Sequence, residues 1–191
     1  MAPPAVPYHR QEGEDFCGPA CLLMVIEALG QPSRTQPSLY DDAHDHGAED
    51  PQAWWASPPD GMEWALENRA AMSKSTLEVV TFKTELPITR RLVWSLFQHS
   101  VPPIALVYGW DHWVVVVNYD ISRNPTGPSD SGYEIRALEI HDPWRTLDDP
   151  DPPPPPPPRH VTLDEWQDTY LKPVPQGHWE GKQVAVGVFT E

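Results

Sequence analysis

The chain has 191 residues and a formal net charge of −15, from 28 acidic and 13 basic side chains. A chain of this length favours one domain with a substantial hydrophobic core, so we predict a single domain over residues 1–191. Because the basic residues are few and scattered, the composition argues against nucleic acid and against an anionic membrane as partners.

The sequence has no apolar run near the length that spans a bilayer. Its N-terminus, MAPPAVPYHR, also lacks the basic and apolar regions of a cleaved signal peptide. The two cysteines, Cys17 and Cys21, are four residues apart, a spacing that makes a poor disulfide framework and favours a reducing compartment. We therefore expect a cytoplasmic protein, or one exported without a cleaved signal peptide.

The first predicted element is a helix within residues 11–30, which read QEGEDFCGPACLLMVIEALG. Asp15 is its expected N-cap, Pro19 suits the first turn, and Gly30 ends it. Nearly every residue from position 20 to position 29 is apolar, so we expect this helix to be buried on all sides.

Cys17 stands at the start of this helix. The unpaired N–H groups and the positive end of the helix dipole favour a thiolate there. A cysteine in an apolar segment more often fills the core, and Cys21, one turn later, fits that interpretation. Cys17 precedes the apolar run and is followed by Gly18, which lets another segment approach closely. Cys17 is therefore the candidate nucleophile.

Residues 31–57 carry prolines and acidic residues without a sustained period, and we predict a partly irregular insert loop. His44 and His46 lie within it, in DDAHDHGAED. Together with the carboxylates around them they can offer ligands to a divalent cation, but no third histidine or cysteine lies at ligand spacing. A solvated acidic loop is the favoured interpretation.

In the rest of the chain, most of the predicted strands come after most of the predicted helices. Helices are expected over residues 57–69, 86–98 and 165–171, the last with a capping box of Thr162 and Glu165. Strands are expected over residues 77–82, 104–108, 113–119, 133–140 and 183–189, and the VVVV run indicates a strand covered on both faces. This order predicts an α+β fold in which the Cys17 helix packs on an antiparallel sheet.

Two further insert loops are predicted. Residues 122–132 are expected to connect a β-hairpin, and residues 145–160 contain an unbroken proline tract from Pro152 to Pro158. The tract is expected to form a stiff polyproline II spacer. A second interpretation is that it docks into an aromatic-lined groove of a partner protein.

A nucleophilic thiol needs a proton acceptor, and the acceptor needs a group that orients it. His112, at the start of a predicted strand, is the candidate base. Asp142 follows the next predicted strand along the chain, and antiparallel pairing of the two strands through the 122–132 loop brings it beside His112. Asn118 is the second choice for this role because it lies in mid-strand. Gln11 is the candidate oxyanion donor, together with the backbone N–H of Cys17.

Together, Gln11 to Cys17 in QEGEDFCGPACL, the HWVVVVNYD segment at His112 and the DPW at Asp142 resemble the papain-like cysteine peptidases. The likeness is to the bacterial branch that contains the bacteriocin-leader peptidases and their stand-alone relatives. It runs from about Gln11 to Trp144 and more weakly to the end. It implies a papain-like fold with no cofactor or metal ion, Cys17 as nucleophile, His112 as base, Asp142 as orienting residue and Gln11 in the oxyanion hole. It also implies that a peptide or protein substrate is cleaved through an acyl-enzyme.

Three features differ from that family pattern. His112 follows the cysteine sooner than the roughly 130 residues or more found in papain itself, so a compact version is expected. Asp111 stands where relatives often have glycine, which is expected to raise the pKa of His112 or to narrow the cleft. The proline insertion after Asp142 is unusual.

Three other functions remain open. The same triad can transfer an acyl group to an amine or deamidate a glutamine side chain. The fold can also serve as a non-catalytic binding module, which the proline tract and the acidic surface favour. A metal hydrolase built on His141, Asp142, His44 and His46 is the weakest alternative, because neighbouring residues of a strand point to opposite sides.

Overall fold

A computed structural model describes residues 3–70, 77–144 and 158–190. Its helices are α1 (Cys17–Ala28), α2 (Gln36–Asp45), α3 (Pro59–Arg69), α4 (Glu85–Trp94) and α5 (Leu163–Glu165), with the π-helical turns η1 (Ser95–His99) and η2 (Trp166–Tyr170). Its strands are β1 (Leu77–Phe82), β2 (Ile104–Val107), β3 (His112–Ile121), β4 (Ile135–His141), β5 (Arg159–Thr162) and β6 (Gln183–Val188). The proline tract, apart from Pro158, lies outside the described residues.

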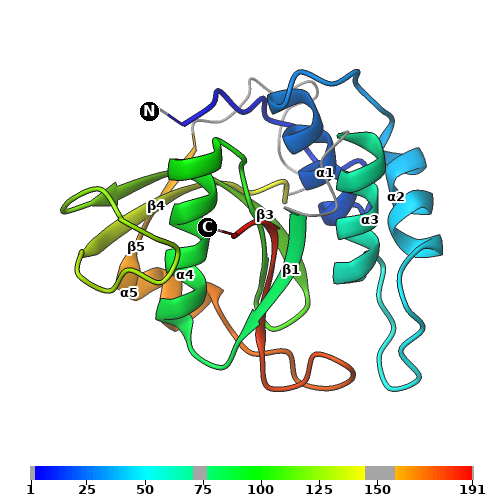
Figure 1. Cartoon of the computed structure of the whole chain (residues 1–191). Coiled ribbons are helices and arrows are strands. Elements are labelled where there is room, and N and C mark those ends of the chain that lie inside the picture. Colours follow the sequence, from blue (N-terminus) through cyan, green and yellow to red (C-terminus); the bar gives the residue numbers. More distant parts are fainter. Residues whose placement is uncertain (1–2, 71–76, 145–157, 191) are drawn as a thin grey trace.

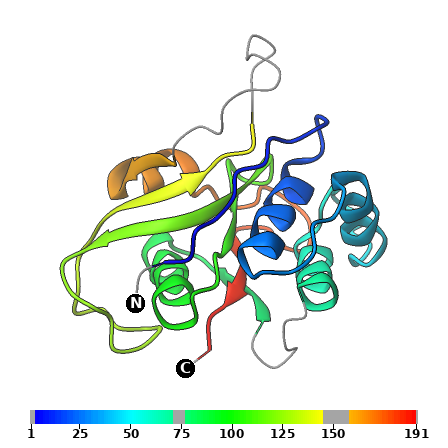
Figure 2. The same ribbon diagram turned by 90° about the horizontal axis from the view of Figure 1, so that it is seen from above.

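The strands form one antiparallel sheet in the order β1-β6-β2-β3-β4-β5. Helices α1, α2 and α3 lie on one side of the sheet and α4 on the other (Figure 1, Figure 2). In β3, Val115 and Val117 join the core beneath α1, whereas Val114 and Val116 join the core beneath α4. The predicted α+β fold and the two-sided burial of the VVVV run are confirmed.

Helix α1 is buried over most of its length, and Gly30 ends it in the left-handed region (φ 72°) as predicted. The prediction that Asp15 caps it is wrong, because Phe16 holds the N-cap position and no side chain caps the helix. The N–H of Phe16 donates to the carbonyl of Gly13 (3.2 Å), so a tight turn precedes the helix. This turn leaves Asp15 one residue too early, exposed to solvent.

Residues 31–57, predicted to be a partly irregular insert loop, contain helix α2, which was not predicted. Among the apolar residues of α2 only Leu39 and Ala43 are buried, so no apolar period marks the helix. It is stabilised instead by contacts with its neighbours. The carboxylate of Asp42 accepts two hydrogen bonds from the guanidinium of Arg69 in α3 (2.5 and 2.7 Å).

The other elements lie close to their predicted positions, with one exception. Helix α4 and η1 together occupy the predicted 86–98 helix, and the hydroxyl of Thr162 accepts a hydrogen bond from the N–H of Glu165 (3.2 Å), as expected for a cap. Strand β5 was not predicted, because it begins within the insert loop that we placed at residues 145–160. It has four residues, of which only Val161 is buried, so it gives no clear alternation.

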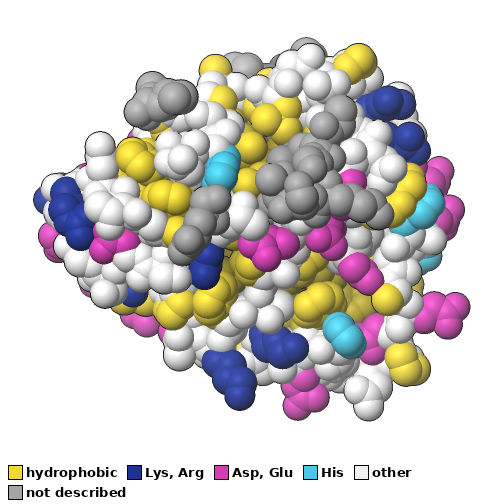
Figure 3. Space-filling view, in the orientation of Figure 1, with side chains coloured by type: hydrophobic (Ala, Val, Ile, Leu, Met, Phe, Trp, Pro, Cys, Tyr) yellow, Lys and Arg dark blue, Asp and Glu magenta, His cyan; other side chains and the backbone are white. Residues whose placement is uncertain are grey.

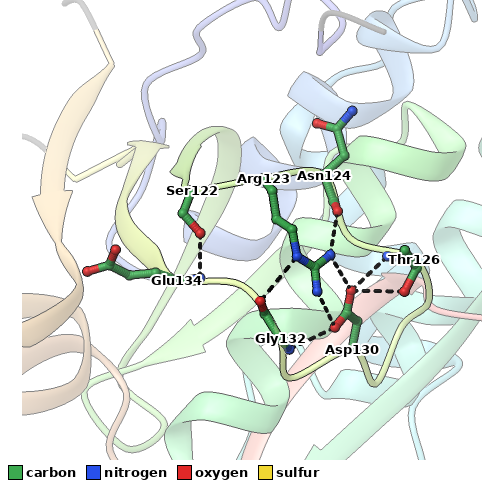
Figure 4. A network of polar contacts seen from close by, with 7 residues as sticks. All are labelled: Ser122, Arg123, Asn124, Thr126, Asp130, Gly132 and Glu134. Carbon is green, nitrogen blue, oxygen red and sulfur yellow. Dashed lines mark hydrogen bonds and ion pairs between the residues drawn. The ribbon is translucent and has the colours of Figure 1, made fainter.

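The loop between β3 and β4 is organised around one carboxylate (Figure 4). Asp130 accepts hydrogen bonds from the guanidinium of Arg123 (2.8 and 3.0 Å) and from the backbone N–H groups of Gly132 (2.8 Å) and Thr126 (2.9 Å). The guanidinium of Arg123 and these N–H groups hold the pKa of Asp130 well below its usual range. Beyond this loop β4 runs back along β3, so the end of β4 returns to the start of β3.

Charged side chains are interspersed on the face drawn in Figure 3. Among the residues coloured there, Lys and Arg lie singly or in small groups, separated by acidic and neutral side chains. Within the described ranges, no helix has both the length and the apolar character needed to cross a membrane.

Candidate active site

Cys17 is the first residue of α1, and it lines a surface cleft of about 450 Å³. It is 8% exposed. Its N–H is one of the first four of the helix, which have no carbonyl partner within the helix. The next residue, Gly18, lies so close to Ser57 that a Cβ there would be 2.5 Å from the Ser57 side chain. Gly18 therefore allows another segment to approach α1 closely, as we expected from the sequence.

His112 is the first residue of β3 and is 4% exposed. Its Nε2 lies 2.7 Å from Oδ1 of Asp142. An ionised carboxylate only accepts hydrogen bonds, so Nε2 carries the hydrogen and donates it. The other ring nitrogen, Nδ1, is buried and has no hydrogen bond of good geometry to any described residue. Nδ1 is therefore the nitrogen that is available as a base.

The pKa of His112 is raised from 6.5 to about 9. Burial lowers it, because burial disfavours the charged imidazolium, but the hydrogen bond with Asp142 and the neighbouring Cys17 side chain raise it by more. The two neighbours thus favour the protonated imidazolium form of His112. Asp111 is not among the groups with the largest effects on this pKa, and it lines the cleft instead.

Asp142 directly follows β4, and hydrogen bonds fix the turn that carries it. Its Oδ1 also accepts the N–H of Trp144 (2.9 Å), and its backbone carbonyl accepts the hydroxyl of Tyr8 (3.0 Å). The N–H of Gln11 donates to the carbonyl of Pro143 (3.1 Å). The N-terminal segment, which runs across the sheet beside α1 in Figure 2, is therefore bonded to this turn. No pattern in the sequence indicates this role of Tyr8.

Two aromatic rings flank His112. The ring of Tyr108 stacks on the imidazole with a centroid distance of 6.4 Å, and Trp144 meets it edge to face at 5.7 Å. Both rings are partly exposed, Tyr108 at 38% and Trp144 at 57%. Both rings pack against the imidazole that bonds to Asp142. Trp144 was noted in the sequence only as part of the DPW motif, and Tyr108 was not singled out.

Gln11 lies near the site, but its amide is turned toward its own loop. Nε2 donates to the carbonyls of Gly13 (2.9 Å) and Glu14 (3.1 Å), and Oε1 is buried without a hydrogen bond to any described residue. A role in an oxyanion hole therefore requires the amide to rotate away from these two carbonyls.

Gln36 of α2 holds the loop that carries Gln11, and it was missed because α2 was not predicted. It is 2% exposed. Its Oε1 accepts the N–H of Glu12 (2.9 Å), and its Nε2 donates to the carbonyl of Arg10 (2.6 Å). A buried glutamine thus fixes the backbone on both sides of Gln11.

The other sequence candidates have partners away from His112. Asn118 donates to the carboxylate of Glu139 (3.1 Å), so Asp142 and not Asn118 is bonded to the imidazole. Cys21 is fully buried, its thiol donates to the carbonyl of Trp113 (3.3 Å), and burial raises its pKa. Cys21 is therefore a packing residue behind Cys17.

The histidines considered as metal ligands contact the protein itself. His46 stacks on Trp64 with a centroid distance of 3.4 Å, and His44 lies 3.3 Å from the carbonyl of Trp55. His141 lies 3.1 Å from the carbonyl of Val6. Across residues 3–70, 77–144 and 158–190, no group of three or more His, Cys, Asp or Glu side chains is arranged to hold a metal ion.

Comparison with known proteins shows similarity at the level of structure. No family model and no curated protein matches the sequence. One similar structure is a double glycine motif protease from an AMS/PCAT transporter in complex with the leader peptide, at 14% identity and a TM-score of 0.53, covering 98% of this chain and 95% of that one. Another is the peptidase domain of Streptococcus ComA, a bi-functional ABC transporter involved in a quorum sensing pathway, at 16% identity and a TM-score of 0.51, covering 96% of this chain and 99% of that one. This chain has the papain-like fold of such peptidase domains, as the sequence resemblance predicted.

Proposed function

We propose that the protein is a cysteine peptidase in which Cys17 is the nucleophile, His112 the general base and acid, and Asp142 the residue that orients His112. The observation that carries the proposal is the 2.7 Å contact between Nε2 of His112 and Asp142, which leaves Nδ1 for the Cys17 thiol. The raised pKa of His112, to which Cys17 contributes, supports the pairing. The papain-like fold supports it further.

The reaction begins with transfer of the thiol proton of Cys17 to Nδ1 of His112. The thiolate attacks the carbonyl carbon of the scissile peptide bond and forms a tetrahedral intermediate. Nδ1 then gives its proton to the leaving amine, the C–N bond breaks, and a thioester remains on Cys17. Water attacks the thioester as Nδ1 takes a proton from it, and the carboxylic acid leaves with the thiolate restored. Asp142 stabilises the imidazolium at each stage in which it is charged.

The oxyanion of the intermediate is held by the N–H of Cys17 and by the amide of Gln11, once that amide has turned toward the cleft. A variant separates this role from activation of the thiol. Gln11→Ala is expected to lower kcat about 100-fold and to leave alkylation of Cys17 by iodoacetamide within about twofold of the wild-type rate. Loss of both would mean that Gln11 supports the site as a whole.

The substrate is a peptide that lies across the cleft beside Cys17. The similar transporter protease is a double glycine motif protease that was solved with its leader peptide. Peptides that carry a double-glycine motif are therefore the first substrates to test here.

The deciding experiment measures thiol reactivity and cleavage in the same preparation. In a Cys21→Ala background Cys17 is the only thiol of the chain. We expect iodoacetamide at pH 6 to alkylate Cys17 faster than a free thiol, and His112→Ala to reduce that rate at least tenfold, because an unpaired thiol ionises only near pH 8.5. Equal rates in the two proteins would refute the pairing of Cys17 with His112.

Mass spectrometry of a mixed peptide library then identifies the reaction, with Cys17→Ala as the control. A cut backbone supports the peptidase. A gain of about one dalton or an amine adduct on an intact peptide would instead support deamidation or acyl transfer by the same triad. Full biological effect of the Cys17→Ala protein would support a non-catalytic binding module.

A further inference from the structure

The cleft beside Cys17 has an unusual lining. The residues that line it include Glu14, Asp15 and Asp111 and several tryptophans. Among the described residues that line it, none is lysine, arginine or histidine. The cleft therefore combines acidic and aromatic surfaces around the proposed nucleophile.

Among the described residues, no basic side chain pairs with these three carboxylates. Glu14, Asp15 and Asp111 are all exposed, and no ion pair joins them to a basic side chain in the described ranges. Exposed carboxylates are charged at neutral pH. A cleft walled by charges of one sign concentrates the field and attracts ligands of the opposite sign.

The aromatic walls suit the same kind of ligand. Trp54 is 66% exposed, and Trp55 meets Trp110 edge to face at a centroid distance of 5.8 Å. Tryptophan is the aromatic side chain that binds a cation most strongly over its ring face. Exposed apolar area of this kind also packs well against the aliphatic stem of a lysine or arginine.

A buried hydroxyl adds a third element. Ser57 lines the cleft and is 3% exposed, and its hydroxyl has no hydrogen-bond partner among the described residues. A buried polar group without a partner is costly. The Ser57 side chain packs against Gly18, so a ligand group bonds with this hydroxyl only where that contact opens.

We infer that the cleft binds a lysine or arginine side chain of the substrate peptide, next to the scissile bond. The carboxylates of Glu14 and Asp111 attract its charge, and the tryptophan rings pack against its stem and head group. The inference rests on the proposed function only in naming a peptide as the ligand; the preference of the cleft for cations can be measured without peptide cleavage.

The test compares how fast Cys17 reacts with two methanethiosulfonates, one carrying a trimethylammonium group and one a sulfonate, in the Cys21→Ala background. In both reactions the thiolate forms a disulfide with the sulfenyl sulfur of the reagent, the S–S bond of the thiosulfonate breaks, and methanesulfinate leaves. We expect the cationic reagent to react about tenfold faster at low salt, after both rates are divided by those of 2-mercaptoethanol. The preference should shrink as salt is raised, since about 0.1 M salt screens charges beyond about 10 Å.

The test is stringent because an imidazolium at His112 by itself favours the anionic reagent. A normalised ratio at or below one would overturn the inference. In the double variant Glu14→Gln, Asp111→Asn the preference for the cation should disappear. The matched control is Asp164→Asn, Asp168→Asn, which removes the same charge from exposed residues outside the cleft lining and should keep the preference. Persistence in the first variant, or loss in the control, would also overturn the inference.

A second arm separates this inference from the proposed function. Cleavage of double-glycine peptides is compared with lysine, norleucine or glutamate at each position that adjoins the double-glycine motif. We expect lysine to raise kcat/KM about tenfold over norleucine at one position, and Glu14→Gln, Asp111→Asn to abolish that difference. Cleavage with equal kcat/KM for the lysine and norleucine peptides would overturn the inference but would still support the peptidase proposal. If no peptide is cleaved while Cys17 still prefers the cationic reagent, the peptidase proposal fails and the cation preference stands.

Discussion

Replacing Asp142 by asparagine tests how the site charges its histidine. The amide oxygen of asparagine can still accept the hydrogen of Nε2 of His112, now 2.7 Å from Oδ1 of Asp142. It can also accept the N–H of Trp144, which now donates to the same oxygen at 2.9 Å. The substitution therefore removes the negative charge and preserves the hydrogen bonds. Any change in the pKa of His112 then reports the charge of Asp142.

The structure fixes the direction of the change and its approximate size. A pKa of about 9 for His112, against 6.5, corresponds to about 3 kcal/mol in favour of the imidazolium. Burial opposes this stabilisation, and Asp142 and Cys17 share the remainder. Because a carboxylate at this distance shifts a neighbouring pKa by about 1–3 pH units, we expect Asp142→Asn to lower the pKa of His112 by roughly 1–2 pH units.

The pKa is measured by NMR titration of the His112 ring, in wild-type protein and in a Cys17→Ala background that removes the contribution of the thiol. Asp120→Asn serves as the control, because Asp120 is an exposed carboxylate of the same strand whose partner is Arg136 (3.1 Å). It should leave the titration of His112 unchanged. An unchanged midpoint in Asp142→Asn, or one that rises, would refute the charge-based account of the site.

Three further predictions concern the pH dependence of stability, the packing of α2 against α3 and the position of the N-terminal segment. Because the pKa of His112 is raised by folding, the stability that His112 contributes is fully present below about pH 6.5 and is lost as the pH rises through about 9. In urea unfolding, the free energy by which wild type is more stable than Asp142→Asn should therefore shrink across that window. A stability difference that grows with pH would contradict this account. Gly61→Ala places a Cβ against the backbone carbonyl of Ala43, so it should lower the free energy of unfolding by roughly 1–3 kcal/mol or more, whereas Gly127→Ala, with nothing within 4 Å, should change it by less than about 0.5 kcal/mol. Tyr8→Phe removes the hydrogen bond to the carbonyl of Asp142 and should cost about 1 kcal/mol of stability while slowing iodoacetamide alkylation of Cys17; an unchanged alkylation rate would show that Tyr8 does not position the triad.

The parts of the fold that the sequence predicted are those with a strong apolar pattern. Helix α1 has a long apolar run and β3 has four valines in succession, and both were placed within a few residues. Helix α2 and strand β5 escaped because each buries little apolar surface of its own. Their stability comes from contacts with distant segments, such as the pair of Asp42 with Arg69, and such contacts leave no periodic signal.

The candidate site was predictable where a local rule places a residue. It was not predictable where the rotamer of a side chain or a contact with a distant segment determines the position of the group. The helix terminus selected Cys17, and antiparallel pairing brought the end of one strand to the start of another, which is why Asp142 lies beside His112. No rule of spacing indicates that the amide of Gln11 turns toward Gly13. Trp54, Trp55 and Trp110 of the cleft were equally hidden, because they come from loops whose neighbours are set by the whole fold.

The N-terminal segment links two parts of the site that the sequence separates by more than a hundred residues. Tyr8 and Gln11 bond to the turn of Asp142 and Pro143, and Gln36 bonds to the backbone on both sides of Gln11. The loop of the proposed oxyanion donor and the turn of the orienting carboxylate are therefore held by one set of hydrogen bonds. A substitution that loosens this segment should disturb both the reactivity of the thiol and the stabilisation of the oxyanion. Gln11→Ala, by contrast, leaves the backbone bonds in place and should disturb only the stabilisation of the oxyanion. Comparing Gln11→Ala with Tyr8→Phe therefore separates positioning by the N-terminal segment from the chemistry of the Gln11 amide.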